Sequence, residues 1–570
     1  LFDRLLIMDV GGYPIYDGNP LNAIVHFKTH SYRGNSHERE CSLCGNVNPE
    51  QIFNLIDARI VDEYGAETQT RKKDAKDWNE LYTIHKVTKK IEIKDSKIDS
   101  SSKLPSKLIQ LWTYFKRDLL SKVSNLQYIL VNLLVAPSLA LILSFFIKFF
   151  DWRNGIESYS YFSNENIPQY IFISIIVSIF LGLTVSAEEI NKDKEILSRE
   201  KFLNLSRNSY LLSKISILLS ISAIQSLTFV LIGNYILEIE GMLFEYWLVL
   251  FSTACVSNIA GLNISSAFNS AKVIYIIVPL LIIPQLLFSG VIVKFDKLHP
   301  SLSDATKVPW VGNMMVSRWA YEALTVEQAS QNQLSKQTFE HDLLLSNAQW
   351  KKDYWLPELQ SEKSIMLNAN DFDKAVVANA KLTMANELLK ENKLWGNWKC
   401  KGCFDDLATK TMTSEEDFEN INAFLDTLRL QWINTMTVEK KAIEKFIDKT
   451  GAKKYRRLKD IYQNESLDNL VTNKMEKNKI IVTPGYLYQN DDPIFNDPQR
   501  VSFFNSHFFA PYKYIFGKRY TTFQINLIII WVISILLYIL LYFDILRLML
   551  VGMMRLSIRI RPNKKAPAAD

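Results

Sequence analysis

The residues best suited to chemistry form a small histidine and cysteine cluster near the start of the chain. His37, Cys41 and Cys44 have the spacing H-x3-C-x2-C, and His30 precedes them. Thiolate and imidazole ligands at such intervals can hold a zinc ion, with His30 as a fourth ligand. The same CxxC pattern also occurs in tight turns without metal, so the sequence leaves zinc binding and a reduced structural turn both open.

A second CxxC pair, Cys400 and Cys403, lies far along the chain in a polar region. The membrane topology given below predicts that the two pairs lie on opposite sides of a bilayer, which excludes a joint four-cysteine site. A local disulfide, a tight turn and a redox site are the alternatives for this second pair.

Motifs of enzymes are otherwise missing from the sequence. It contains no G-x4-G-K-S/T phosphate-binding loop, no dinucleotide-binding loop, and no hydrolase triad or pair of catalytic acids. The first five long apolar runs carry no ionisable residue, which argues against a proton relay or an ion pathway. These absences favour a membrane cavity for bulky, largely apolar molecules over a catalytic site.

The elements that must position such a cavity are membrane helices. Hydrophobic residues make up 48% of the 570 residues and charged residues 22%, but the apolar residues are concentrated in blocks. A run of about 20 apolar residues is long enough to cross the hydrocarbon core of a bilayer. Six uncharged runs meet this condition: 126–147, 166–187, 215–237, 246–271, 273–293 and 520–543. The predicted fold class is therefore mainly α, a polytopic membrane protein with six transmembrane helices.

Charges beside these runs predict their orientation. Basic residues gather between the second and third runs and after the sixth, whereas the loop between the third and fourth contains Glu238, Glu240 and Glu245 and no basic residue. The positive-inside rule then places both termini in the cytoplasm. The formal charge of +6 thus reflects membrane orientation rather than nucleic-acid binding.

The polar segments around the spans have patterns of their own. Residues 29–104 are predicted as a cytoplasmic linker with the first CxxC pair and one helix over 48–65, and residues 105–123 as a basic amphipathic helix in the membrane interface. Spans one to five occupy 124–328. The sixth occupies 520–556, and a basic cytoplasmic tail follows at 557–570.

Residues 329–519 form a large polar insertion between spans five and six. One helix is predicted over 371–395. A longer one begins at a capping box of Thr413 and Glu416 and ends at Gly451. The apolar residues of the longer helix recur at heptad-like spacing: Phe418, Ile421, Leu425, Leu428 and Trp432. The insertion is therefore predicted to be a mainly helical extracytoplasmic domain.

The first 28 residues predict two short strands, a Gly11-Gly12 turn and a helix that begins at Asn19-Pro20. Such a piece is the end of an α/β domain. It resembles the close of the nucleotide-binding domain in the G subfamily (white/pleiotropic drug resistance-like) of ABC transporters, which has a segment like LFD-x-L-L-x-L-x-x-G-G-x-x-x-Y-x-G. The resemblance implies that residues 1–28 are a remnant of that domain in an N-terminally truncated chain. It also implies that the residues binding ATP and magnesium lie upstream.

A second stretch has a more specific resemblance to the same subfamily. LLFSGVIV at 286–293 resembles the end of its fifth span. The residues that match the pattern after this span are Pro309, Trp310, Ser317, Tyr321 and Glu322. The family implies that this segment re-enters the outer membrane face without spanning. It also implies that Gly290, Val291 and Ile292 form an outward valve above a cavity lined by spans two and five of two protomers.

The charged loop at 187–214 is predicted to be helical and to face the cytoplasm. By position it resembles the first intracellular loop of the subfamily, where a short coupling helix contacts the nucleotide-binding domain. The resemblance assigns this contact to Glu195, Arg199, Glu200 and Phe202. A solvated loop without such a contact is the alternative.

These features predict the membrane-spanning permease part of an ATP-driven ABC exporter, although the chain itself lacks ATPase motifs. The predicted partner is a second half-transporter, in a homodimer or heterodimer. The predicted cargo is apolar or amphipathic, and the predicted location is a bacterial inner membrane, in contact with its lipids. The alternative is a membrane-anchored receptor or assembly scaffold that acts through its large extracytoplasmic domain.

Overall fold

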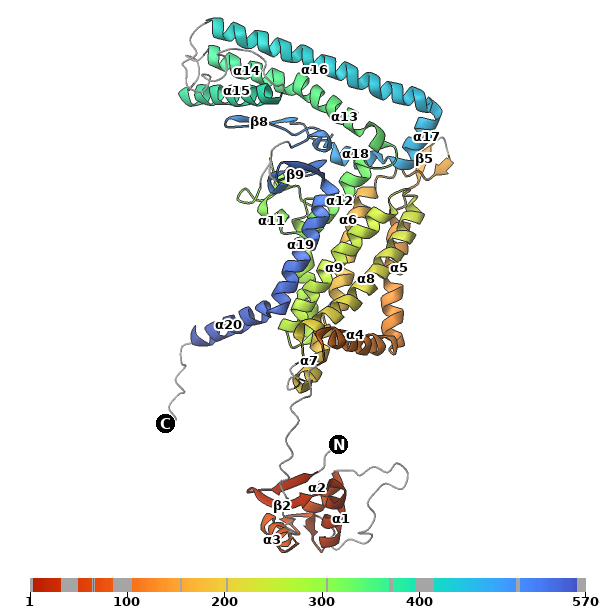
Figure 1. The fold of residues 1–570 in the computed structure, drawn as a ribbon, viewed down its shortest axis with the longest axis vertical. Helices are drawn as coiled ribbons and strands as arrows, with labels where there is room; N and C mark the ends of the chain where they lie inside the picture. Colours follow the sequence, from red (N-terminus) through yellow and green to blue (C-terminus); the bar gives the residue numbers. More distant parts are fainter. Residues whose placement is uncertain are drawn as a thin grey trace. The chain divides into compact units, whose positions relative to one another are not determined.

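A computed structural model describes residues 4–31, 50–63, 65, 67–85, 105–153, 156–200, 203, 205–303, 306–368, 373–394, 415–498 and 503–560. The chain divides into two compact units, Leu1–Ser102 and Lys103–Asp570. Figure 1 shows the helices and strands of each unit. The first unit is small and mixed, and the second is mainly helical.

The first unit opens with a β-hairpin followed by a helix. β1 (Leu5–Asp9) pairs antiparallel with β2 (Tyr13–Gly18), and α1 (Pro20–His30) begins at the predicted proline. Apolar side chains from β2 and α1, including Ile15 and Phe27, are buried together. The order of elements is the one that the sequence predicts for residues 1–28.

Residues 50–85 are folded, although the sequence predicts a linker there. They form α2 (Glu50–Ile56), β3 (Arg59–Val61), β4 (Glu67–Arg71) and α3 (Ala75–His85). The helix predicted over 48–65 is confirmed only for α2, because β3 and β4 pair as a hairpin. Trp78 of α3 is buried, with its ring centroid 5.2 Å from that of Phe27. A few apolar residues among many charges are enough to add this stretch to the core.

The second unit is built on a bundle of apolar helices. Five helices in its described residues have the length and composition to cross a membrane: α5 (Leu126–Ile147), α6 (Ile167–Ser186), α8 (Arg207–Leu237), α9 (Leu243–Ala267) and α19 (Thr522–Tyr542). A sixth, α10 (Ala271–Leu287), has only 17 residues. The run predicted as the fifth span, 273–293, is therefore helical only as far as Leu287. The chain then turns through Gly290, whose φ is +80°.

Small residues let two of these helices approach closely. A Cβ added to Gly182 of α6 would lie 2.7 Å from the carbonyl oxygen of Ala254 in α9. A Cβ added to Gly261 of α9 would lie 2.0 Å from Ser186 Oγ of α6. Both distances are far shorter than a normal contact, so only glycine allows this spacing. Close packing at small residues is a main source of association between membrane helices.

Three helices lie at one end of the bundle, which we call the α7 end. They are α4 (Lys107–Val123), α7 (Glu189–Glu200) and α20 (Ile545–Ile560), and Figure 1 shows α4 and α20 running across the direction of the spans. Leu108 and Trp112 are exposed on α4, as expected for an amphipathic interface helix. α20 is a correction, because the sequence predicts one continuous span over 520–556 and a tail after it.

The opposite end, which we call the domain end, carries the large insertion. The helices of this end that precede the insertion are α11 (Trp310–Asn313) and α12 (Val316–Ser330). The insertion begins with α13 (Ser335–Trp350), a π-helical turn (Lys351–Trp355) and α14 (Leu356–Leu367). They are followed by α15 (Lys374–Leu394), α16 (Glu415–Thr450), α17 (Ala452–Tyr462) and α18 (Glu465–Val471). Three hairpins complete this end: β5 (Asp151–Arg153) with β6 (Ile156–Ser158), β7 (Ile480–Thr483) with β8 (Tyr486–Gln489), and β9 (Tyr512–Ile515) with β10 (Lys518–Thr521).

The prediction of a mainly helical insertion is confirmed. The predicted helix over 371–395 is α15, and the long predicted helix is α16, which has 36 residues and ends before Gly451 at a φ of +86°. The heptad-like side chains of α16, such as Leu425 and Leu428, are buried in a core that α16 shares with α13, α14 and α15. Thr413, the proposed N-cap, lies outside the described residues.

The first unit contains a histidine cluster that makes its stability depend on pH. The ring of His30 lies 4.5 Å from that of His26 and 4.7 Å from that of His85, measured between centroids. Burial and these neighbours lower the pKa of His26 to about 4. The unfolded chain binds a proton near the ordinary value of about 6.5. The folded unit therefore loses stability as the pH falls through 6.5 towards 4.

We expect α1 to be less stable at pH 5 than at pH 7, by about 1 kcal/mol after allowance for the partial exposure of His26. Hydrogen exchange of the α1 peptides, corrected for the intrinsic pH dependence of exchange, measures this difference. His26→Phe removes the titrating group and should reduce the difference, whereas His341→Phe in the second unit should not. A difference that His26→Phe leaves unchanged would contradict the assignment.

Candidate functional site

A fully buried ion cluster joins α12 to the last apolar helix of the bundle, α19. Lys513 Nζ of β9 donates to Glu322 Oε2 of α12 at 2.5 Å, and both side chains have no exposed surface. Asn526 Nδ2 of α19 donates to the same carboxylate oxygen at 2.8 Å. The backbone NH of Phe509 donates to the other oxygen, Oε1, at 3.2 Å. One carboxylate thus holds together three segments of the chain.

A second cation completes this cluster. Arg318, one turn before Glu322 on α12, places its guanidinium 3.4 Å from the carboxylate and 3.8 Å from the centre of the Trp319 ring. Burial alone would raise the pKa of Glu322, but the charges of Arg318 and Lys513 outweigh it, so the pKa is lowered. Burial lowers the pKa of Lys513, and the charge of Glu322 opposes this shift. The site keeps a negative carboxylate in an apolar environment.

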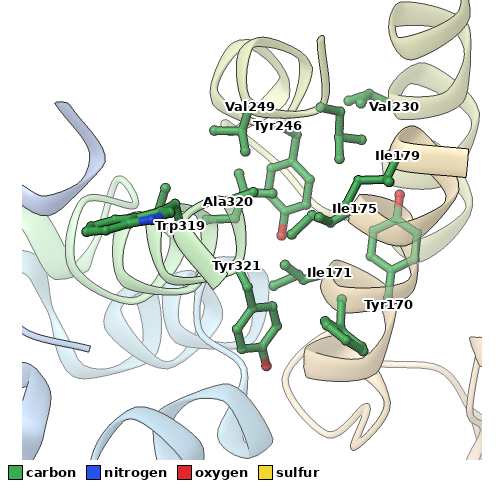
Figure 2. Close-up of a cluster of buried hydrophobic side chains, with 14 of the residues drawn as sticks. Tyr170, Ile171, Ile175, Ile179, Val230, Tyr246, Val249, Trp319, Ala320 and Tyr321 are labelled. Atoms are coloured by element: carbon green, nitrogen blue, oxygen red, sulfur yellow. The ribbon is translucent and has the colours of Figure 1, made fainter. Parts of the chain in front are cut away.

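α12 lies inside the bundle rather than at its surface. Figure 2 shows Trp319, Ala320 and Tyr321 in one apolar cluster with side chains of α6 and α9, two helices that contact α12. Trp310, in the short helix α11, is 65% exposed, whereas Trp319 is fully buried. The sequence predicts an element that re-enters the membrane face without spanning, and this stays a prediction. The apolar positions of α12 are core positions.

Ser317 fastens α12 to the end of α10. Its backbone NH donates to Gln285 Oε1 at 3.0 Å, and its hydroxyl donates to the carbonyl oxygen of Gln285 at 2.7 Å. Pro309 precedes α11 in an extended conformation and serves as its N-cap residue. The residues of the re-entrant motif therefore have different places: Ser317, Tyr321 and Glu322 are buried, and Trp310 is exposed.

The predicted valve lies where α10 ends. The ring of Phe295 packs between two glycines, since a Cβ added to Gly290 or Gly312 would lie 2.5 or 2.8 Å from it. The backbone NH of Val291 donates to Ser289 Oγ at 3.3 Å. Val291 is half-buried, and Ile292 is exposed. The structure therefore places a tight aromatic contact directly beside the predicted valve residues.

A large cavity opens at the same place. Its volume is about 1,220 Å³, and it is lined by the turn at Gly290 and Val291, the start of α6, α18 and the β7–β8 hairpin. Apolar side chains such as Phe149 and Phe508 alternate with charged ones such as Lys294. The cavity thus connects the end of α10 with the insertion, and its lining suits an amphipathic molecule.

The α7 end has an ion cluster of its own. Lys214 Nζ of α8, a buried side chain, lies 2.6 Å from Asp118 of α4 and 3.3 and 2.9 Å from Glu189 and Asp193 of α7. Lys122 of α4 pairs with Glu189 as well. Five charges from three helices are therefore in mutual contact, and they fix α7 and α4 against the first turns of α8.

Comparison with protein families identifies one region of this bundle. Residues 109–328, from α4 through α12, match the family model of the ABC-2 type transporter. This region is an ABC transporter membrane domain. Comparison with curated proteins finds no match to the chain.

The predicted coupling residues of the membrane domain are only partly brought together. Glu195 and Arg199 are exposed on α7, whereas Glu200 pairs with Arg117 of α4 at 2.7 Å. Phe202 lies outside the described residues. α7 is a helix, as predicted, and its exposed turns are accessible to another domain. The coupling contact and its alternative, a solvated loop without such a contact, both stay predictions.

The zinc prediction stays a prediction. His37, Cys41 and Cys44 lie outside the described residues, as do Cys400 and Cys403. Among the residues that are described, no group of three or more histidine, cysteine or acidic side chains is arranged to hold a metal ion.

Sequence reasoning missed most of the charged residues of both clusters. Arg318 and Glu322 are opposite charges one turn apart on α12, and this spacing is a usable signal. Lys513, Asn526 and Lys214 carried no such signal, because their partners are distant in sequence. Lys214 also stands at the start of an apolar run, where a lysine is expected to face water.

We expect Glu322→Gln to lower the free energy of unfolding of the membrane domain by about 3–5 kcal/mol, because two buried cations lose their counter-charge. An SDS titration in detergent micelles, followed by tryptophan fluorescence, measures the change. The control is Glu340→Gln, which breaks a solvent-exposed pair with Arg519 but leaves an amide oxygen that accepts the hydroxyl of Tyr512, and it should cost less than about 1 kcal/mol. Equal effects of the two substitutions would refute the role given to the buried cluster.

Lys214→Met should lower the temperature at which the detergent-solubilised protein unfolds by about 5 °C or more, because three carboxylates then repel one another. Lys192→Met on α7 removes an exposed i,i+4 pair with Glu188 and should change this temperature by less than about 1 °C. Differential scanning fluorimetry compares the two variants. A Lys214 variant as stable as the Lys192 variant would show that the α7 cluster does not hold the helices together.

Proposed function

We propose that the chain is the membrane-spanning permease part of an ATP-driven ABC exporter. The observation that carries this proposal is α7, whose first residues Glu189 and Ile190 are buried in the bundle while Glu195 and Arg199 are exposed. A helix held in this way can be displaced by a neighbouring domain and can transmit that displacement to the spans. The match of residues 109–328 to the ABC-2 type transporter family supports a nucleotide-binding domain as the domain that displaces it.

The proposed route of this movement continues from α7 into α9 and α10. The backbone NH groups of Ile190 and Asn191 both donate to Ser265 Oγ of α9 at 3.0 Å. Lys194 Nζ donates to the carbonyl oxygen of Phe268 at 2.7 Å, where α9 ends and the chain turns into α10. A displacement of α7 is therefore passed to the corner between these two helices.

Cargo is proposed to cross between two half-transporters, identical or different, rather than through one chain. The cavity enclosed by α6, α8 and α9 has about 10 Å³, which is room for one water molecule. α10 buries only Ile274 and Val278, whereas Tyr275, Ile276 and Leu280 are exposed. A second subunit facing this side of α10 would enclose an apolar path that suits apolar or amphipathic cargo.

In this proposal ATP and magnesium bind to a nucleotide-binding domain, and the β1–β2 hairpin and α1 are the closing elements of that domain. The α7 end faces the cytoplasm of a bacterial cell and the domain end faces outwards, in agreement with the basic residues at the α7 end. Cargo leaves past Val291 into the cavity of about 1,220 Å³. A receptor or scaffold that uses this cavity is the second candidate.

We expect Val291→Glu to reduce export at least tenfold while the complete transporter still binds ATP, because a carboxylate at the valve opposes the passage of apolar cargo. Export of fluorescent amphipathic dyes and labelled lipids from cells that produce the complete transporter measures the effect, and a nucleotide-binding assay checks the ATP site.

The matched control is Val438→Glu, which adds the same charge to the exposed surface of α16, outside the cavity. This variant should export normally. Unchanged export by Val291→Glu would remove the valve assignment. A complete transporter that moves no dye and no lipid, and hydrolyses ATP at the same rate with all of them, would favour the receptor or scaffold.

A further inference from the structure

The last helix of the chain, α20, is turned away from the span that precedes it by a fixed corner. Asp544 has a φ of +51°, so the helical path of α19 ends there. Its carboxylate lies 2.6 Å from Arg207 of α8 and accepts the hydroxyl of Ser266 in α9 at 3.2 Å. Arg207 also donates to the carbonyl oxygen of Leu541, the last turn of α19, at 3.0 Å. Two other helices thus hold the corner.

The sequence of α20 is amphipathic and basic. In a helix with 3.6 residues per turn, the positions of Arg547, Arg555 and Arg559 fall within an arc of about 120°. The positions opposite them are apolar, and they are Ile545, Met549, Met553, Leu556 and Ile560. The segment 545–560 contains no acidic residue. A basic amphipathic helix of this kind is typical of a membrane surface.

Beyond its first turn, where Ile545 is half-buried, the described side chains of the apolar face of α20 have little protein cover. Met549 and Met553 are 60% and 56% exposed. Arg547 is exposed as well. The contacts of α20 with the bundle are made to α9 and α19, next to the corner. Exposure of these apolar side chains to water is unfavourable in free energy, whereas the headgroup region of a bilayer accommodates them.

The position of α20 relative to the bilayer follows from the bundle. α19 is one of the spans, and α20 begins three residues after it ends. α4, whose exposed Leu108 and Trp112 mark the membrane interface, lies at the same end and likewise runs across the spans (Figure 1). α20 is therefore at the depth where lipid headgroups meet the hydrocarbon core.

We propose that α20 lies flat in the headgroup region at the α7 end and binds anionic phospholipids through its arginines. Guanidinium groups bind phosphate oxygens in a bidentate manner, and each basic residue near an anionic membrane surface contributes about 1 kcal/mol. The corner at Asp544 then links lipid binding to α8 and α9, the helices that contact α7. The proposal needs only that the second unit lies in a bilayer, and it depends neither on cargo nor on ATP.

Hydrogen exchange of the full chain in lipid nanodiscs tests this proposal. Nanodiscs of phosphatidylcholine alone are compared with nanodiscs that contain 30% phosphatidylglycerol, so that both leaflets carry the probe lipid whatever the orientation. We expect amides of residues 545–560 to exchange about tenfold more slowly in the anionic nanodiscs, and less so in high salt. Exchange of α19 in the same samples should not differ and shows that the fold is intact.

Three variants make the result decisive. The triple charge reversal R547E, R555E and R559E should abolish the difference between the two nanodiscs, whereas replacing the same arginines by lysine should retain most of it. The matched control reverses three exposed basic residues of α17, Lys453, Arg456 and Arg457, and should leave the difference unchanged. Equal protection of α20 in neutral and anionic nanodiscs, or a difference that survives the triple reversal, would overturn the proposal. Loss of dye export alone would not bear on it.

Discussion

The buried pair of Glu322 and Lys513 is the contact on which the domain end of the membrane domain depends. Its two residues are 191 positions apart in the sequence, and neither has any contact with solvent. A single buried charge costs several kcal/mol, so neither residue is tolerated without the other. α12 can occupy the middle of the bundle only when the chain has returned from the whole insertion and has placed β9 beside it.

The α7 end is also stabilised by buried ion pairs, but between different residues. Lys214 pairs with carboxylates from α4 and α7. Between the two charged ends the helices are packed by apolar and small side chains, with a few buried hydrogen bonds such as the one from Asn258 of α9 to Ser222 of α8. α10 is the exception, because Pro279 and Pro284 interrupt its hydrogen bonding and few of its residues are buried. Its firm attachments are the corner after α9 and the bonds between Gln285 and Ser317. Of all the spans, α10 is therefore the one that can shift at the lowest cost in packing.

Much of this architecture could be predicted from the sequence, because hydropathy and helical periodicity are local properties. The spans, the amphipathic α4 and the apolar stripe of α16 are examples. What could not be predicted depends on residues that meet only in the fold. The few apolar residues that form the small core around Trp78 are difficult to recognise among the many charged residues of 50–85. The corner at Asp544 is one residue in an apolar stretch. The partners of Lys513 and Lys214 lie on other helices, and no spacing rule connects them.

Because the ion pair lies where the insertion joins the bundle, the length of the outer part of the insertion is independent of how the membrane helices pack. α12 ends at Ser330 and the chain returns at Tyr512, so both ends of the insertion are held beside Glu322. The long helix α16 packs in a separate hydrophobic core with α13, α14 and α15. Phe339 of α13 and Leu467 of α18, in contrast, belong to the core of the bundle. Evolution can therefore lengthen, shorten or replace the part of the insertion that forms the separate core, from α14 to α16, while the membrane helices keep their packing.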